Sequence, residues 1–363
     1  MARESRSRGP TIVDVAQAAG VSVSTVSRVM RDHADVGAAT RAHVREAVDR
    51  LGYRPSPIAR ALVSGESRLV TLLVSDITNP FYPQLAKSVE QEAKQAGYAV
   101  VICNTEDRTA ETRRYVKRLL RQGLEGVIHA SVAHDEQALL SLMADERRVV
   151  FTNRRPAQSA VSYVVSDNEG GAGELTRHLL SLGHRRIGFI TGPKYARNAM
   201  ERLKGFRLAM KQAADTQSFV AEGDFSVESG RRAVLEWIKD KPAPTAMIAV
   251  NDSVALGALG ALVDSRLRVP DDVALAGFDG TQLSASPLLS LTTVDQHIEN
   301  LGRRSVQILL GQLASAGEFN PVREVLPTKL LLRASTLGQA GGEALDGQGR
   351  KGANVSPTER PSS

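Results

Sequence analysis

Residues 11–30 read TIVDVAQAAGVSVSTVSRVM and predict two short helices joined by a corner. Thr11 is a typical N-cap residue, because Asp14 follows it at the spacing of a capping box. Ser22 can cap the second helix in the same way. The corner between the two helices is only about three residues long, which is typical of a helix-turn-helix motif.

The second of these helices has an apolar face and a polar face. Val26 and Val29 share one face and are expected to pack against the rest of the domain. The other face suits the major groove of DNA, because hydroxyl groups donate or accept hydrogen bonds, valine contacts thymine methyl groups and arginine bridges guanine or phosphate. Its candidate DNA contacts are Ser22, Val23, Ser24, Thr25, Ser27 and Arg28. The alternative is that these hydroxyls only cap turns.

A third helix and a linker follow the motif. The pattern of residues 38–52 places the apolar side chains on one face of a helix that ends at a glycine. Thr11 and Thr40 begin helices whose free N–H groups can bind phosphate, although each would more simply be a cap. Residues 54–67, RPSPIARALVSGES, contain two prolines and a Ser/Gly-rich end, which indicates a domain linker.

The chain of 363 residues has a net charge of +6, and most of the excess lies in its N-terminal part. Residues 1–68 contain 11 Arg, no Lys and 7 acidic residues, a net charge of +4; the remaining 295 residues contain 35 basic and 33 acidic residues, a net charge of +2. Arginine is suited to forked contacts with phosphate and guanine. This distribution favours a nucleic-acid partner, with a solvated Arg-rich tail as the alternative.

From Arg68 onward, apolar runs of strand length alternate with amphipathic segments of helix length. This alternation predicts parallel sheets with helices on both faces. About eleven strand candidates are too many for one sheet, so we expect two similar lobes with doubly wound parallel sheets. Residues 338–363 are rich in Gly, Ser and Pro and poor in large apolar residues, and we expect this tail to be disordered.

Several classes of protein are disfavoured by the sequence. The single cysteine, Cys103, cannot form an internal disulfide and lies in an apolar run typical of a buried strand. Neither a signal peptide nor a membrane-spanning run is recognisable, so we expect a cytoplasmic protein. Phosphate loops, metal-ligand spacings and nucleophile elbows are also absent from the sequence, and we therefore expect no cofactor, no metal and no catalysis.

A ligand site is expected where the parallel strands end, because α/β sheets bind ligands at the carboxyl ends of their strands. Acidic, amide, aromatic and arginine side chains occur at or near such positions: Asp76, Asn79, Phe81, Arg202, Phe225, Asn251 and Asp279. Together they suit a sugar-like polyol, whose hydroxyls take paired hydrogen bonds and whose ring stacks on an aromatic plate. Singly, each has a simpler reading as a helix cap, a solvated charge or a core residue.

The sequence resembles the lactose- and galactose-repressor (LacI/GalR) family along almost its whole length. The resemblance rests on several segments in the same order and spacing: TIVDVAQAAGVSVSTVSRVM, VGAATRAHVREAVDRLGYRPSPIARAL, NPFY, SDNEGG, LGHRRIGFITGP, ERLKGF, PTAMIAVNDSVALGAL and LRVPDDVALAGFDG. Three departures concern the DNA-binding part. Val23 and Ser24 replace larger residues of the best-known relatives, so their operator sequence does not transfer. Gly37 replaces a common capping serine, and Arg31 replaces a common asparagine.

The resemblance implies a homodimer that binds pseudo-palindromic, double-stranded operator DNA and responds to a small effector bound between two lobes. It further implies a hinge helix, in which Leu62 wedges between bases in the minor groove while Ser56 and Ala59 lie against the groove wall. For the effector site, it supports Arg202, Phe225, Asn251 and Asp279, and it extends to Phe81, Asp76, Asn79 and Asp167.

These expectations define an architecture. An all-α helix-turn-helix domain covers residues 10–55, a hinge covers 55–64, and a two-lobed α/β body like that of periplasmic binding proteins covers 66–335. The expected function is that of an effector-controlled transcriptional regulator, a repressor, with no membrane partner. A solute-binding protein would share the body but require export, and a sugar-processing enzyme would require a catalytic set that the sequence does not display.

Overall fold

The computed structural model describes residues 10–30, 33, 35–53, 67–130, 136–143, 148–156, 161–239, 242–315 and 320–337. The chain divides into two compact units, residues 1–67 and residues 68–363. Ser56, Ala59 and Leu62 of the expected hinge, and the tail over 338–363, lie outside the described residues. Within the described residues, no helix combines the length and the apolar character that a membrane span requires.

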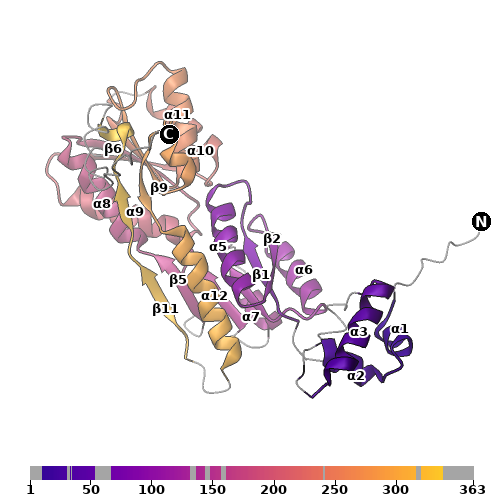
Figure 1. The fold of residues 1–363 in the computed structure, drawn as a ribbon. Helices are drawn as coiled ribbons and strands as arrows, with labels where there is room; N and C mark the ends of the chain where they lie inside the picture. Colours follow the sequence, from indigo (N-terminus) through magenta and orange to yellow (C-terminus); the bar gives the residue numbers. More distant parts are fainter. Residues whose placement is uncertain are drawn as a thin grey trace, which may run out of the picture. The chain divides into compact units, whose positions relative to one another are not determined.

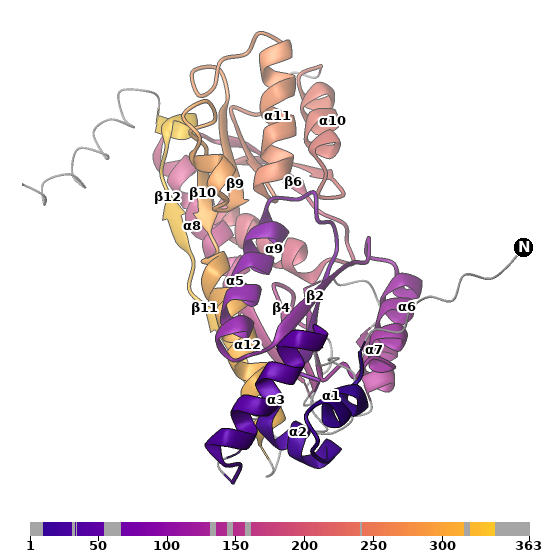
Figure 2. The same ribbon diagram turned by 45° about the vertical axis from the view of Figure 1, so that its right-hand side comes forward.

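The first unit contains three helices, α1 (Ile12–Ala18), α2 (Val23–Met30) and α3 (Ala38–Leu51), which pack together at the indigo end of the chain (Figure 2). Their shared core includes Val15, Val26, Val29 and Val44, each almost completely buried. The predicted inward face of α2 is therefore confirmed. A core this small depends on every valine, because each one fully buried contributes about 1.5–3 kcal/mol.

Local sequence fixes the ends of these helices. The Thr11 hydroxyl accepts a hydrogen bond from the Asp14 amide, and the Asp14 carboxylate accepts one from the Thr11 amide, which is the predicted capping box. Gly37 provides no side-chain cap to α3, as expected for a glycine at this position. The helix ends at Gly52, whose φ of 61° is the left-handed conformation that glycine adopts without strain.

The second unit contains two six-stranded sheets, one in each of two lobes. The lobe 1 sheet has the order β11-β5-β4-β3-β1-β2, and the lobe 2 sheet has the order β12-β10-β9-β8-β6-β7. In both sheets the chain reverses its direction of winding beside the first strand, between β1 and β3 and between β6 and β8. Such switch points open a crevice at the carboxyl ends of the strands. The strands are β1 (Leu69–Val74), β2 (Ala99–Asn104), β3 (Gly126–His129), β4 (Val149–Thr152), β5 (Ser162–Ser166), β6 (Arg186–Thr191), β7 (Gln217–Glu222), β8 (Ala246–Ala249), β9 (Ala274–Asp279), β10 (Thr292–Asp295), β11 (Arg323–Leu326) and β12 (Lys329–Leu331).

Helices cover both faces of the lobe 1 sheet. On one face α5 (Phe81–Gln95) and α12 (Ile298–Ala314) lie side by side (Figure 1), and their apolar residues share a core with Leu72 and Ile128. On the other face α6 (Thr109–Leu120) and α7 (Glu136–Met143) pack over Leu73 and Cys103. Cys103 is a buried strand residue, as predicted. Both faces being buried explains the long apolar runs of these strands.

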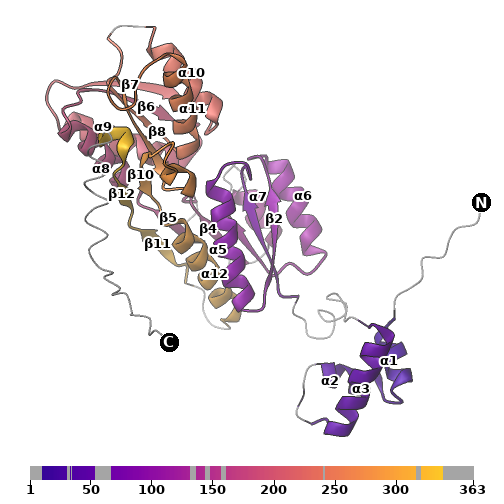
Figure 3. The same ribbon diagram turned by 45° about the horizontal axis from the view of Figure 1, so that its top comes forward.

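Lobe 2 has the same layered construction. The helices α8 (Asn168–Ser181) and α9 (Arg197–Lys211) cover one face, and α10 (Val227–Trp237) and α11 (Asp252–Asp264) cover the other (Figure 3). The short helix η2 (Gln282–Ala285) follows β9. Helices α10 and α11 approach closely at Gly257, where a Cβ atom would lie 1.7 Å from the Val227 carbonyl oxygen. Only glycine permits this separation.

The polypeptide crosses between the lobes three times, and the last crossing explains a departure from the predicted parallel sheets. β12 pairs antiparallel with β10, whereas the other paired strands of the two sheets are parallel. Only Pro327 and Thr328 separate β11 from β12. Because β11 ends at the junction between the lobes, the strand that follows must run away from it. A parallel strand would have needed a long crossover connection.

Candidate functional site

The polar face of α2 is exposed, as the sequence predicts. Val23 is 42% exposed, Ser24 and Arg28 are also exposed, and Thr25 and Ser27 are half-buried. The Ser22 hydroxyl accepts a hydrogen bond from the Thr25 amide at 3.1 Å and lies within 2.8 Å of the Ser24 and Thr25 hydroxyl oxygens. Ser22 therefore caps the helix, while the neighbouring hydroxyls remain on the surface, where they are available to a partner.

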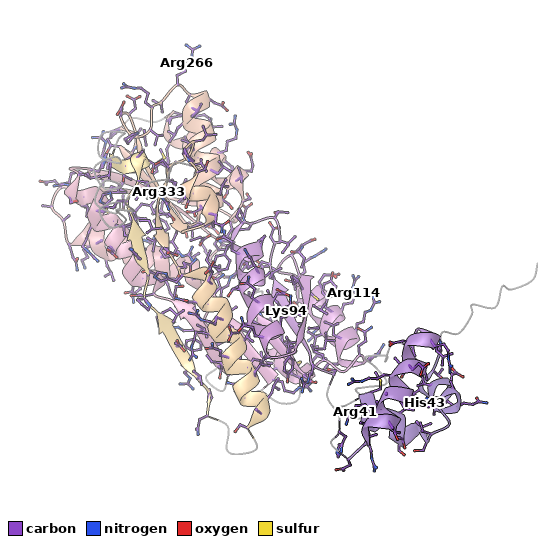
Figure 4. The ribbon with its side chains drawn as sticks, in the orientation of Figure 1. Arg41, His43, Lys94, Arg114, Arg266 and Arg333 are labelled. Atoms are coloured by element: carbon purple, nitrogen blue, oxygen red, sulfur yellow. The ribbon has the colours of Figure 1, made fainter. Side chains whose placement is uncertain are left out.

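The two threonines predicted at helix starts differ in position. Thr11 is the N-cap of α1, and its hydroxyl is engaged with Asp14 at 2.7 Å. Thr40 lies within the first turn of α3, two residues after the helix begins. In both helices, first-turn N–H groups lack intrahelical acceptors, which is the property that phosphate binding uses. Arg41 anchors the preceding loop by donating to the His33 and Val36 carbonyl oxygens at 2.8 and 3.3 Å (Figure 4).

A cleft of about 100 Å³ lies at the carboxyl ends of the strands in the second unit, and both lobes contribute to its walls. Seven of the eight predicted effector residues line it: Asp76, Asn79, Phe81, Arg202, Phe225, Asn251 and Asp279. The remaining lining residues are Ser75, Tyr82, Asp107, Asn153, Arg154, Asn198, Asp224 and Ser226. The switch points of the two sheets therefore converge on one polar cleft.

Arg202 is the most tightly held cation of the cleft. It is only 2% exposed, and its Nε donates to Asn168 Oδ1 at 2.9 Å while Nη1 donates to the Val250 carbonyl oxygen at 2.5 Å. The guanidinium also stacks on the Phe278 ring, 3.8 Å from the centroid. Burial lowers the pKa of Arg202 and the nearby Asp279 carboxylate opposes that shift. Arg202 lies in the second turn of α9, which begins at Arg197.

Asp279 is the carboxyl partner of Arg202, at 3.5 Å from Nη1. It also accepts a hydrogen bond from Gln296 Nε2 at 2.6 Å. Burial raises the pKa of Asp279 to about 8; Arg202 opposes this rise and the neighbouring carboxyl of Asp252 adds to it. Asp252 lies behind the cleft wall and accepts hydrogen bonds from the side chains of Thr281 and Thr293.

Arg154, which follows β4 in lobe 1, is the second buried cation of the cleft. Its Nη2 lies 3.6 Å from the Asp107 carboxylate and 3.4 Å from the Ser75 hydroxyl oxygen. Its guanidinium lies over the ring of Phe225 in lobe 2, 5.4 Å from the centroid. The neighbouring Asn153 is 5% exposed, and its Oδ1 accepts no hydrogen bond from the described residues. This amide oxygen is therefore available to a hydroxyl group in the cleft.

Asp167 is the one predicted effector residue that does not line the cleft. Its side chain accepts a hydrogen bond from the Gly170 amide at 2.9 Å and caps helix α8. It borders a separate depression together with Arg155 and Glu169. The strand before it, β5, lies next to the edge of its sheet, two strands away from the switch point beside β1.

The sequence did not indicate the part of the lobe 1 wall that follows β2 and β4. Arg154 and Asn153 follow β4, and Asp107 follows β2. The rule that ligands bind at the carboxyl ends of parallel strands, here called the rule of strand ends, therefore applies to them as it does to Asp76. Arg154 lies in the run NRRP, where three polar residues in succession read as a surface loop. The burial of Arg154, 2% exposed, is produced by Phe225 and Tyr82, which are far from it in sequence.

Comparison with known proteins bears on both units. Residues 11–56 match the bacterial regulatory proteins of the lacI family, and residues 176–336 match the periplasmic binding protein-like domain. The ribose operon repressor of Halalkalibacterium halodurans is 35% identical over 332 residues, 90% of this chain and 97% of that protein. The transcriptional regulator DegA of Bacillus subtilis is 34% identical over 337 residues, 90% of this chain and 98% of that protein.

Solved structures of bacterial regulators also resemble this chain along most of its length. The Lac repressor dimer bound to operator and an anti-inducer superposes with a TM-score of 0.81 at 30% identity, covering 91% of this chain and 99% of that chain. The regulator CelR in complex with cellobiose superposes with a TM-score of 0.67 at 32% identity, covering 90% of this chain and 99% of that chain. The chain therefore belongs to the LacI family of bacterial regulatory proteins.

Proposed function

We propose that this regulator is a homodimeric repressor that binds a pseudo-palindromic operator, and that a small sugar-like metabolite bound in the cleft controls its affinity for DNA. One observation carries the proposal. The same chain contains a helix-turn-helix unit with an exposed polar face on α2 and a body with a polar cleft lined from two lobes. A DNA-reading surface and a small-molecule site in one chain are the two parts that a metabolite-controlled regulator requires.

The cleft offers a physical route for control. Asp76, Asp107 and Arg154 come from lobe 1, whereas Arg202 and Asp279 come from lobe 2. A ligand that bonds both groups stabilises the arrangement in which the lobes are close. Such a ligand shifts the equilibrium between the close and the separated arrangement of the lobes only to the extent that it binds one more tightly than the other. We assign the coupling to the expected hinge over residues 55–64, the stretch of chain that connects the helix-turn-helix domain to the body.

Exposed apolar side chains on lobe 2 support a dimer. Leu288 is 94% exposed, Val263 is 63% exposed and Leu283 is 42% exposed. Ile102, on the edge strand β2 of lobe 1, is 46% exposed. Large apolar side chains that are this exposed are candidates for burial by a second copy of the chain. A two-fold dimer would present two copies of α2 to two half-sites about 34–36 Å apart, one turn of DNA.

A mobility-shift assay on the DNA upstream of the protein's own gene and on palindromic fragments tests this function. We expect specific, salt-sensitive binding, because neutralised phosphates release counterions. Arg28→Ala on α2 should weaken binding, whereas Arg266→Ala, an exposed arginine of the body, should leave it unchanged. Binding should also respond to a sugar from a panel. Absence of salt-sensitive binding to every fragment would reject the regulator.

A further inference from the structure

We propose that the cleft selects an uncharged, single-ring polyol and excludes the phosphorylated and carboxylated forms of the same sugar. This inference narrows the effector of the proposed function and rests on it. It follows from three properties of the cleft. Its two guanidinium groups already bind partners within the protein, its walls carry more carboxyl groups than guanidinium groups, and its size suits a single ring.

Neither guanidinium group is free to bind an anion. Arg202 commits Nε and Nη1 to acceptors of the protein, Asn168 Oδ1 and the Val250 carbonyl oxygen, and is fixed on the Phe278 ring. Recognition of phosphate or carboxylate by arginine normally uses two parallel N–H groups, which this geometry leaves unavailable. Nη2 is the nitrogen of Arg202 that these two bonds leave for a ligand.

Arg154 is balanced by a carboxylate in the same way. Asp107 lies 3.6 Å from its Nη2, and Asp107 is itself held by a hydrogen bond of 2.6 Å from the Ser75 hydroxyl. An anion that enters beside Arg154 would have to displace Asp107 or lie next to it. Two anionic groups at that separation repel strongly where water is excluded.

The walls carry more carboxyl groups than guanidinium groups. The cleft is lined by four aspartates, Asp76, Asp107, Asp224 and Asp279, and by two arginines. If Asp279 retains its proton, three carboxylates still face two guanidinium groups. Asp76 and Asp224 are exposed, and each accepts hydrogen bonds from its own turn, through Thr78 and Ser226. Among the lining residues the carboxylates therefore outnumber the guanidinium groups, which disfavours an approaching phosphate.

Amides and aromatic rings provide the remaining contacts, and these suit a neutral ring. The buried Asn153 Oδ1 accepts no hydrogen bond from the described residues, and a hydroxyl can supply one. Phe81 of lobe 1 and Phe225 of lobe 2 offer one aromatic ring from each side. The C–H faces of a sugar ring pack on such rings, and its rim of hydroxyls meets the amides and carboxylates.

The size of the cleft suits a ligand of one ring. Its volume is about 100 Å³. Since a water needs ~10–15 Å³ of such space, the cleft has room for roughly seven to ten water-sized groups. A pentose or hexose has about ten to twelve non-hydrogen atoms, close to this room, whereas a disaccharide has about twice as many.

The test uses isothermal titration and thermal shift on the intact protein with matched probes: D-ribose and D-ribose 5-phosphate, and D-glucose with glucose 6-phosphate, glucuronic acid and cellobiose. We expect at least one neutral monosaccharide to bind about tenfold tighter or better than its phosphorylated or carboxylated derivative and than cellobiose. Stronger binding of a phosphate or an acid would overturn the inference. So would the failure of every probe and of a wider monosaccharide panel.

A charge variant makes the test sharper. Asp107→Asn removes the anion beside Arg154, while asparagine can still accept the Ser75 hydroxyl and tolerates the left-handed φ of 52° at this position. We expect the variant to bind the sugar phosphate or uronic acid at least about tenfold tighter than the unmodified protein does. Asp215→Asn is the control, because Asp215 is an exposed left-handed residue that does not line the cleft.

Unchanged exclusion of anions in Asp107→Asn, with folding verified by circular dichroism, would refute the role of Asp107. The wild-type comparison remains decisive if that variant does not fold. Operator binding is measured separately, with and without sugar. Loss of operator binding with intact sugar selectivity would reject the proposed function alone, and intact operator binding with reversed selectivity would reject only the present inference.

Discussion

Replacing Arg202 with methionine would remove a buried charge and its donors while keeping much of the side-chain volume against Phe278. Three groups then lose their partner: the Asn168 amide oxygen, the Val250 carbonyl oxygen and the Asp279 carboxyl. A buried acceptor left without its donor costs about 1–3 kcal/mol, so losing all three donors costs roughly 3–5 kcal/mol or more, even where the Asp279 carboxyl takes up a proton. For a body of this size, that loss corresponds to a fall in melting temperature of about 6–20 °C.

The same substitution should make stability more dependent on pH. Burial already raises the pKa of Asp279 to about 8 from its ordinary value of 3.8, and Arg202 opposes this rise. Without Arg202 the pKa rises further. A carboxyl whose pKa is higher in the folded protein favours folding most below pH 4, and that contribution is lost as the pH rises toward the folded value. The variant should therefore be less stable at pH 8 than at pH 5, by a wider margin than the unmodified protein.

Urea unfolding at pH 5 and pH 8 measures both effects. Arg231→Met is the matched control: Arg231 lies 2.6 Å from Asp264, a shorter separation than that of Arg202 and Asp279, but this pair is exposed. An exposed pair is screened by water, so the control should hardly change the free energy of unfolding. Adding Asp279→Asn to Arg202→Met should restore part of the lost stability. Equal losses in the two single variants, or no rescue in the double variant, would show that burial of the Arg202 pair has no energetic importance.

Three further substitutions test other parts of the molecule. Val26→Ala should destabilise the helix-turn-helix unit by about 2 kcal/mol or more and abolish operator binding, while the sugar-induced thermal shift of the body is retained. Val23→Ala, at an exposed site, should leave the free energy of unfolding unchanged. Leu288→Asp should convert a dimer to a monomer in analytical ultracentrifugation, and a persistent dimer would move the interface elsewhere. Gly257→Ala should lower the free energy of unfolding by about 1–3 kcal/mol, because α10 and α11 must separate to admit the methyl group beside Val227.

The sequence predicts the helix-turn-helix unit most directly, because the residues that determine its helices lie close together in the chain. The capping box joins Thr11 to Asp14 within one turn, and the two buried valines of α2 are three residues apart. Strands were predicted well where both faces are buried and the apolar run is continuous, as in β1. The edge strands β7, β11 and β12 are largely exposed and lack that signal.

The sequence predicts only part of the cleft lining, because the environment of the other residues depends on contacts between segments that are distant in the chain. Asn251 and Asp279 follow apolar strands in short, recognisable sequences, whereas Arg154 follows β4 in a run of polar residues. What distinguishes Arg154 from a surface arginine is the ring of Phe225, contributed by the opposite lobe. The burial of a charged residue between two lobes depends on the folded structure. The amino-acid pattern around Arg154 therefore does not predict it.

Asp167 and Asp279 show why a position at a strand end is necessary but not sufficient for a place in the cleft. Both aspartates occur where a buried parallel strand finishes. Asp167 has an ordinary φ of −71° and turns back to cap α8, whereas Asp279 has a φ of 125° and precedes Gly280, which directs its carboxyl toward Arg202. The strand order adds the second difference, because β5 lies toward the edge of its sheet and β9 beside β8, next to the switch point. Lateral order is set by the crossovers of the whole chain. The rule of strand ends therefore selects the correct edge of a sheet, and only the topology selects the residues along that edge.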